Sequence, residues 1–181
     1  MKRLCSLICL ATCVLLPFTV SQAAPIAATG TVEVFFSPHG GATEAIIKEI
    51  NAAAKEILVQ AYSLTSGKIK DALVQARKRG VRVEVLLDFS QAELDSSAGQ
   101  LSNNDIPVFV DTENIRNHDK IMIIDHKTII TGSFDFTRTA EEKSIENLLI
   151  IKDNIPLAEK YQANYAEHRS HSKPYVRYPV K

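Results

Sequence analysis

Residues 118–136 read HDKIMIIDHKTIITGSFDF, and this stretch predicts two adjacent β-strands. The residues from 121 to 124 are apolar and mostly β-branched, which is typical of a buried strand. Residues 128–131 predict a second strand after a turn at Asp125 and His126. Because side chains alternate between the faces of a strand, His118 and Lys120 point the same way. An imidazole and an ammonium on one face form a site for an anion.

The residues that follow the second strand add hydrogen-bond donors. Gly132 lets the backbone approach a ligand closely, and Ser133 supplies a hydroxyl. Phosphoryl transfer needs a nucleophile, fixed cations and donors of this kind. An isolated His-x-Lys is more often a strand-edge histidine beside a lysine that reaches to water. The spacing to Asp125 and Ser133 resembles that of a known family of phosphodiester-cleaving enzymes, and this resemblance favours phosphodiester chemistry instead.

The spacing of His118, Lys120, Asp125 and Gly132-Ser133 resembles the HKD signature of the phospholipase D superfamily. Phe36-Ser37-Pro38 and residues 61–66 are also similar to the small bacterial endonucleases of that superfamily. The resemblance implies metal-independent phosphodiester cleavage through a phosphohistidine, without a cofactor. Such chemistry uses two histidines, one to attack phosphorus and one to protonate the leaving oxygen. Since the chain carries one motif, the resemblance also implies a homodimer with one His118 from each chain.

The resemblance assigns roles to individual residues. His118 is the catalytic histidine, Lys120 and Ser133 act in catalysis and bind the substrate phosphate, and Glu146 orients the histidine. Asp125 is a further catalytic candidate, with a turn-capping role as its alternative.

Asp135 departs from the family pattern. The family usually has asparagine at this substrate-binding position, and an ionised aspartate cannot donate a hydrogen bond to phosphate. Weakened activity is therefore expected.

The first 23 residues predict a secretory signal peptide. Lys2 and Arg3 precede a mostly apolar segment, and small residues end at Ala23, so cleavage is expected there. An uncleaved membrane anchor is the alternative. Residues 24–181 then form a single catalytic domain in a secreted or periplasmic protein, without stable membrane insertion. All the cysteines lie inside the signal, which leaves the domain without disulfides or a cysteine nucleophile.

The charge of residues 24–181 is close to neutral. Without Lys2 and Arg3, 19 basic residues face 21 acidic residues, a net charge of about −2. Nucleic-acid binders usually carry a basic face, so charge neither supports nor excludes a nuclease. Residues 77–79 (Arg-Lys-Arg) read as the solvated end of a helix. The four histidines other than His118 are expected on the surface, and no metal-binding pattern is evident.

The remaining chain alternates strands with amphipathic helices, which predicts an α/β fold: a phospholipase D-like mixed β-sheet flanked by helices. Strands are expected at 31–36, 57–62, 81–87, 107–110 and 145–151, and helices at 43–55, 66–79, 92–103 and 156–168. The segment after Ser170 is expected to be loose or draped over the surface.

Three functions follow from this reading. The first is a nonspecific endonuclease with DNA or RNA as substrate. The second keeps the chemistry and acts on phospholipid headgroups. The third is a weakened or inactive binding homologue, for which Asp135 is the support.

Overall fold

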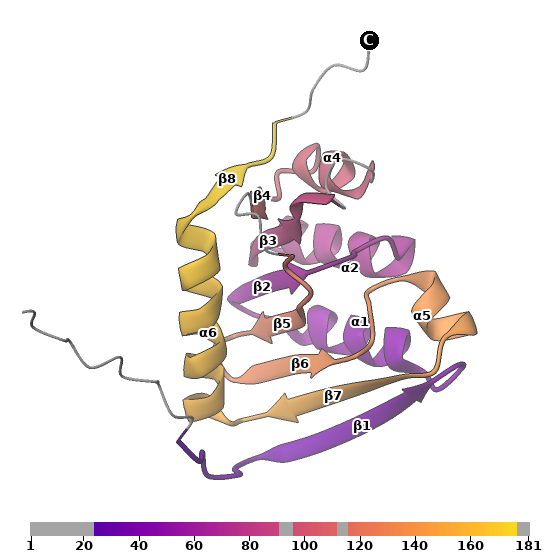
Figure 1. Cartoon of the computed structure of the whole chain (residues 1–181), viewed down its shortest axis with the longest axis vertical. Coiled ribbons are helices and arrows are strands. Elements are labelled where there is room, and N and C mark those ends of the chain that lie inside the picture. Colours follow the sequence, from indigo (N-terminus) through magenta and orange to yellow (C-terminus); the bar gives the residue numbers. More distant parts are fainter. Residues whose placement is uncertain (1–23, 91–95, 112–115, 177–181) are drawn as a thin grey trace, which may run out of the picture.

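The computed structural model describes residues 24–90, 96–111 and 116–176 (Figure 1). One eight-stranded sheet organises them, in the order β1-β7-β6-β5-β2-β3-β4-β8. The strands are β1 (Thr31–Ser37), β2 (Glu56–Ala61), β3 (Arg82–Asp88), β4 (Val108–Asp111), β5 (Lys120–Ile124), β6 (Thr128–Gly132), β7 (Glu146–Lys152) and β8 (Ser172–Pro174). The helices are α1 (Ala42–Ala52), α2 (Gly67–Lys78), α4 (Ser96–Ser102), α5 (Arg138–Lys143) and α6 (Ile155–Ser170).

The sheet is mixed, as predicted. Strands β2, β3 and β4 run parallel to one another, whereas β5, β6, β7 and β1 are joined by antiparallel pairings. The two groups meet where β2 pairs antiparallel with β5 and Ala61 lies opposite Lys120. As a result, the ends of β2, β3 and β4 share one edge of the sheet with the start of β5.

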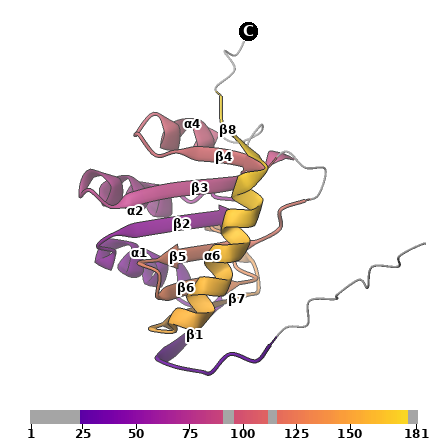
Figure 2. The same cartoon turned by 90° about the vertical axis from the view of Figure 1, so that its left-hand side faces the viewer.

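Helices cover both faces of the sheet, which forms the α/β fold that the sequence predicts. Figures 1 and 2 show α6 crossing one face, with α1, α2 and α4 on the other. The larger apolar core lies beneath α1, α2, α4 and α5, and includes Ile46, Leu73 and Leu101. The smaller core lies beneath α6, where Tyr165 packs against Leu58 and Ile123. The apolar stripes read from the sequence therefore face the sheet.

Polar groups at the helix ends explain where two helices begin. Asn154 caps α6 by accepting a hydrogen bond from the Leu157 N–H, next to a proline in the first turn. The start of α1 has no side-chain cap of its own. Instead, the Glu141 carboxylate on α5 accepts hydrogen bonds from the N–H groups of Gly41 and Thr43. This contact ties α5 to α1 across about a hundred residues of sequence.

The structure corrects the expectation for the C-terminal segment and adds a helix. Residues 172–174 form the edge strand β8, which pairs antiparallel with β4 rather than lying loose. Helix α5 was not predicted, although Thr137 caps it by accepting from the Ala140 N–H. The predicted helix at 92–103 is α4, and residues 91–95 lie outside the described part of the chain.

The predicted signal segment, residues 1–23, also lies outside the described residues. Across the residues that the structure does describe, none of the helices combines the length and the apolar character that a membrane crossing requires.

Candidate active site

His118 and Lys120 lie at the edge of the sheet where β2 and β3 end and β5 begins. Lys120 is the first residue of β5 and is buried, whereas His118 precedes the strand and is exposed. The Lys120 Nζ lies 3.3 Å from His118 Nδ1 and donates to the His118 carbonyl oxygen at 3.0 Å. The pair therefore presents an accessible imidazole with a fixed ammonium beside it.

Backbone contacts hold the segment that carries His118. The buried Asp88 carboxylate, at the end of β3, accepts from the Asn117 N–H at 2.8 Å. The Tyr62 N–H donates to the Asp119 carbonyl at 2.8 Å, and Gln60 Nε2 donates to the Asp119 carboxylate at 2.7 Å. Residues on both sides of His118 are thus tied to β2 and β3, which limits the movement of its backbone.

Tyr62 packs against the catalytic candidates and gathers positive charge. Its ring lies 4.5 Å from the His118 ring between centroids, tilted by 51°. The Lys120 ammonium lies 5.2 Å and the Arg116 guanidinium 5.6 Å from the Tyr62 ring centre. Cations at these distances are attracted to the face of an aromatic ring. The tyrosine therefore links His118 to two cationic groups suited to a phosphate.

Ser133 and Glu146 form a second pair on the same edge of the sheet. The Ser133 hydroxyl donates a short hydrogen bond to the Glu146 carboxylate and accepts from the Asn147 N–H. Gly132 has φ of 147°, and a Cβ there would lie 2.3 Å from the Asn147 carbonyl oxygen. Only glycine permits this close approach of β6 to β7, which places Ser133 beside Glu146.

Asp135 pairs with Lys120. One of its carboxylate oxygens lies 3.1 Å from the Lys120 Nζ, and the aspartate is about 29% exposed. The structure thus brings together His118, Lys120 and Asp135 through the lysine. Glu146 accepts a hydrogen bond from Ser133, and among the described residues no hydrogen bond or ion pair joins it to His118. The expected orienting contact of Glu146 therefore stays a prediction.

Asp125 lies at the other end of β5 from Lys120. Its carboxylate accepts hydrogen bonds from the N–H groups of Ala54, Lys55 and Glu56, at 2.7–2.9 Å. These contacts hold the entry to β2, and Asp125 itself has a left-handed backbone with φ of 50°. The structure does not bring Asp125 to the other candidates, and its contacts are those of the turn-capping alternative.

Three residues of the site have no role in the sequence prediction: Asp88, Tyr62 and Arg116. Tyr62 lies in the stretch 61–66, which the sequence singled out without giving that residue a role. Asp88 follows a predicted strand at its carboxyl end, a position that could have marked it as a candidate. Arg116 carries no local signal, because its proximity to Tyr62 arises from the pairing of β2 with β5.

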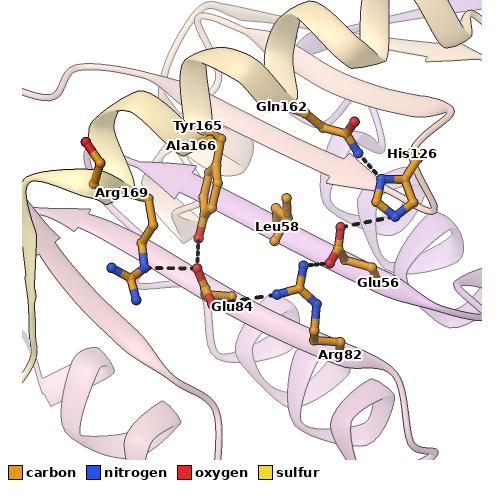
Figure 3. Close-up of a pocket in the computed structure, with 10 residues that line it drawn as sticks. Glu56, Leu58, Arg82, Glu84, His126, Gln162, Tyr165, Ala166 and Arg169 are labelled. Carbon is orange, nitrogen blue, oxygen red and sulfur yellow. Dashed lines mark hydrogen bonds and ion pairs between the residues drawn. The ribbon is translucent and has the colours of Figure 1, made fainter.

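A pocket of about 440 Å³ lies on the α6 face, between α6 and the start of β2 and β3 (Figure 3). Glu84 accepts from the Tyr165 hydroxyl at 3.0 Å and from Arg169 at 3.1 Å, while Glu56 pairs with Arg82 and His126. Burial, reinforced by Glu84, raises the pKa of the Tyr165 phenol. Since Glu56 and Arg82 begin their strands, the pocket lies toward the opposite edge of the sheet from His118. The two glutamates and two arginines that line the pocket balance one another in charge.

The expectation that the other histidines lie on the surface holds for His39 and His126, which are exposed. It is wrong for His168 and His171, which are partly buried and face the buried Asp111. These residues form a group of metal-ligand type, whereas the sequence showed no such pattern. The local signal was the His-x-x-His spacing at a helix end, because residues three apart share a helix face.

Comparison with known proteins identifies relatives in sequence and in fold. A family model described as "Cardiolipin synthase, PLD-like domain" matches residues 46–169. A phospholipase D of Rickettsia prowazekii is 38% identical over 142 residues, covering 78% of this chain and 69% of that protein. Nuc from Salmonella typhimurium, a phospholipase D family member, has a TM-score of 0.77 and 34% identity, covering 81% of this chain and 99% of that chain. NucT from Helicobacter pylori, at 22% identity and a TM-score of 0.72 over 80% of this chain and 99% of that chain, shares the fold.

The fold, the clustered His118 and Lys120 and these relatives define the class of the protein, which is a phosphodiester-cleaving enzyme. The chain belongs to the phospholipase D superfamily.

Proposed function

We propose that this chain is a metal-independent endonuclease of low sequence selectivity that acts through a phosphohistidine on His118. The observation that carries the proposal is the exposed imidazole held beside the buried Lys120 ammonium. An exposed ring can reach a phosphorus atom. A lysine that is fixed in place stabilises the charge on the phosphoryl oxygens without reorganising during the reaction.

The contacts of Lys120 bear on the protonation of His118. While the ammonium donates to Nδ1, the proton of a neutral ring resides on Nε2. Attack on phosphorus needs a neutral ring with a bare nitrogen toward the substrate. Protonation of the leaving oxygen needs an imidazolium, which carries a proton on both ring nitrogens and becomes neutral when it gives one up. The reaction therefore requires two histidines in different states, which one His118 per chain does not supply.

We infer a homodimer in which each chain contributes one His118. Large apolar side chains lie exposed close to the candidate site: Phe36 is 64% exposed and Ile145 is 93% exposed. They adjoin Ser37 and Glu146, which are partners across β1 and β7. Exposed apolar residues beside a polar site support its coverage by another protein surface. Light scattering should find a dimer at assay concentration, and an active monomer would refute this arrangement.

Nucleic acid is the proposed substrate because the cationic side chains near His118 suit a phosphodiester backbone. Arg116 is exposed and lies near Lys120 through their shared contact with Tyr62. An aromatic ring beside cations also suits single-stranded substrates, whose bases stack. The similarity to Nuc, at 34% identity over nearly all of that chain, supports the phosphodiester chemistry of the family.

Cleavage of phospholipid headgroups is the second candidate. The specific observation in its favour is the 38% identity to a protein named phospholipase D in Rickettsia prowazekii. A weakened or inactive binding homologue is the third candidate, supported by the pairing of Asp135 with Lys120. Under either enzymatic assignment, we propose that residues 24–181 act as one domain, exported after removal of residues 1–23.

One experiment separates these candidates. The purified protein is assayed in EDTA against plasmid DNA, single-stranded RNA and phosphatidylcholine vesicles, with His118→Ala in parallel. The proposal expects cleavage of nucleic acid that depends on His118. Headgroup release without nucleic-acid cleavage would assign the phospholipase function. Binding to a substrate without turnover would assign the third function.

A further inference from the structure

Asp111, His168 and His171 come together where β4, α6 and β8 meet. Asp111 ends β4, His168 lies in the last turn of α6, and His171 follows that helix. The strand β8 then begins at Ser172, which lies opposite Asp111 in the sheet. Figure 1 shows β8 leading from the end of α6 to β4. The antiparallel pairing thus fixes both histidines beside a carboxylate about sixty residues away in sequence.

Each histidine lies at a ligand-to-ligand distance from one of the two Asp111 carboxylate oxygens. His168 Nδ1 lies 3.5 Å from one Asp111 oxygen, and His171 Nδ1 lies 3.3 Å from the other. A tetrahedral zinc ion with bonds of about 2.0–2.2 Å holds its ligand atoms roughly 3.3–3.6 Å apart. One ligand atom from each of the three residues lies within 4.8 Å of the others. Two imidazoles and a carboxylate are also a donor set that suits zinc and its neighbours.

Burial distinguishes this group from a chance cluster on the surface. The Asp111 side chain is only 5% exposed, while those of His168 and His171 are 33% and 25% exposed. His168 Nδ1 is a buried atom without a hydrogen-bond partner among the described residues, even though it faces Asp111. A buried polar nitrogen left without a partner is costly. A metal ion bound to this nitrogen would supply the missing partner.

We propose that Asp111, His168 and His171 bind a divalent transition metal, with zinc as the best match, and that water completes the coordination. The strand order places β4 three strands from β5, roughly 14 Å away at the usual strand spacing. The ion would therefore not contact a phosphorus atom attacked by His118. It would join the end of α6 and the edge strand β8 to β4. This structural role is independent of the proposed endonuclease function.

The test measures metal binding directly, without using activity. Tag-free protein is stripped with chelator, exchanged into chelator-free buffer and titrated with Zn²⁺ by calorimetry, and with Co²⁺ by visible absorption. We expect one ion per chain and the intense visible bands of tetrahedral Co²⁺. His168→Ala and Asp111→Asn should each weaken binding by at least about tenfold, the lower end for loss of a metal-site group. His126→Ala, which alters an exposed histidine outside the group, should bind as the wild type does.

Thermal unfolding provides a second readout in case a variant folds poorly. Zn²⁺ should raise the unfolding midpoint of the wild type and of His126→Ala, because a ligand that binds only the folded state stabilises it. It should not raise the midpoint of His168→Ala. Absence of stoichiometric binding by the folded wild type would overturn the proposal. Equal binding by wild type and folded His168→Ala would overturn it too. The contacts of His168 and His171 with Asp111 would then be ion pairs rather than parts of a metal site.

Discussion

The Lys120 Nζ lies 3.1 Å from the Asp135 carboxylate while it also contacts the His118 ring. One ammonium thus joins the catalytic candidate to the residue that departs from the family pattern. An anionic substrate that approaches Lys120 must share this cation with Asp135. The ion pair holds the lysine in place, and at the same time it offsets the positive charge that would attract phosphate.

Replacing Asp135 with asparagine should increase activity. Two unit charges about 4 Å apart interact by about 4 kcal/mol at an effective dielectric of 20, before screening by solvent and Lys120. Recovery of about a third of that repulsion corresponds to roughly a tenfold gain in kcat/KM. The gain should appear in steady-state cleavage assays at low salt. Asp153→Asn, which alters an exposed aspartate paired with Lys127, is the matched control.

Unchanged kinetics of Asp135→Asn would contradict this account of the pair. That result would mean that Asp135 does not face the bound phosphate, and that its contact with Lys120 serves only to position the lysine.

His118→Ala should lose phosphodiester cleavage by roughly a thousandfold or more, since no remaining group supplies the nucleophile. The exposed position of His118 predicts that the variant folds normally, which circular dichroism and the unfolding midpoint would check. Wild-type cleavage should persist in EDTA. His126→Ala is the control, because His126 lies at the far end of β5. Substantial turnover by pure, folded His118→Ala would contradict the assignment of His118 as the nucleophile.

Asp125→Ala should destabilise the fold without changing the chemistry. Its carboxylate accepts three backbone N–H groups at the entry to β2, and their loss should lower the free energy of unfolding by about 2 kcal/mol. Denaturant unfolding measures this change, with Asp71→Ala on the exposed face of α2 as the control. The turnover per folded molecule should stay the same. A loss of turnover at unchanged stability would contradict this prediction and would assign Asp125 a catalytic role.

The ion pairs of Lys152 predict a pH-dependent contribution to stability. Lys152 contacts Glu33 on β1 and Glu49 on α1, and its hydrogen bond lowers the pKa of Glu33 below the ordinary 4.5. The same partners raise the pKa of Lys152 above the ordinary 10.5. A carboxyl with a lowered pKa stabilises the fold above its ordinary value, and this stability is lost as pH falls through the lowered value. For the lysine, stability is present below its ordinary value and lost as pH rises through the raised one.

Lys152→Gln should therefore lower the free energy of unfolding at pH 7, by less than about 1 kcal/mol because Glu33 is partly exposed. The difference from wild type should shrink below about pH 4. Lys127→Gln, at an exposed pair, is the control and should show a smaller effect. A deficit for Lys152→Gln that is equally large at pH 3 and pH 7 would show that packing, not charge, carries the effect.

Local patterns predicted most of the sheet and the group around His118. The β-branched run of β5 and the apolar stripes of α1 and α2 are short-range signals, and they marked those elements within a few residues. Strand alternation and strand ends can be predicted from the sequence, and together they predict that the site residues share one edge of the sheet. The pairing of Lys120 with Asp135 could be predicted for the same reason, because both residues flank predicted strands.

Contacts between segments that are distant in the sequence could not be predicted from local patterns. The strand β8 has three residues and includes a proline, so its pairing with β4 determines its conformation more than its own propensity does. The meeting of Asp111 with His168 depends on that pairing. Likewise, Glu141 caps α1 only because α5 packs beside it, and a six-residue helix has little periodicity to read.

The most direct measurement of the central claim is a search for the covalent intermediate. The protein is mixed with excess oligonucleotide, quenched at alkaline pH within the first turnovers, digested and analysed by mass spectrometry. Covalent catalysis by His118 predicts a phosphate-linked adduct on the peptide that contains His118, and its absence from His118→Ala. Rapid turnover without any adduct in the wild type, or an adduct on another residue, would contradict the account.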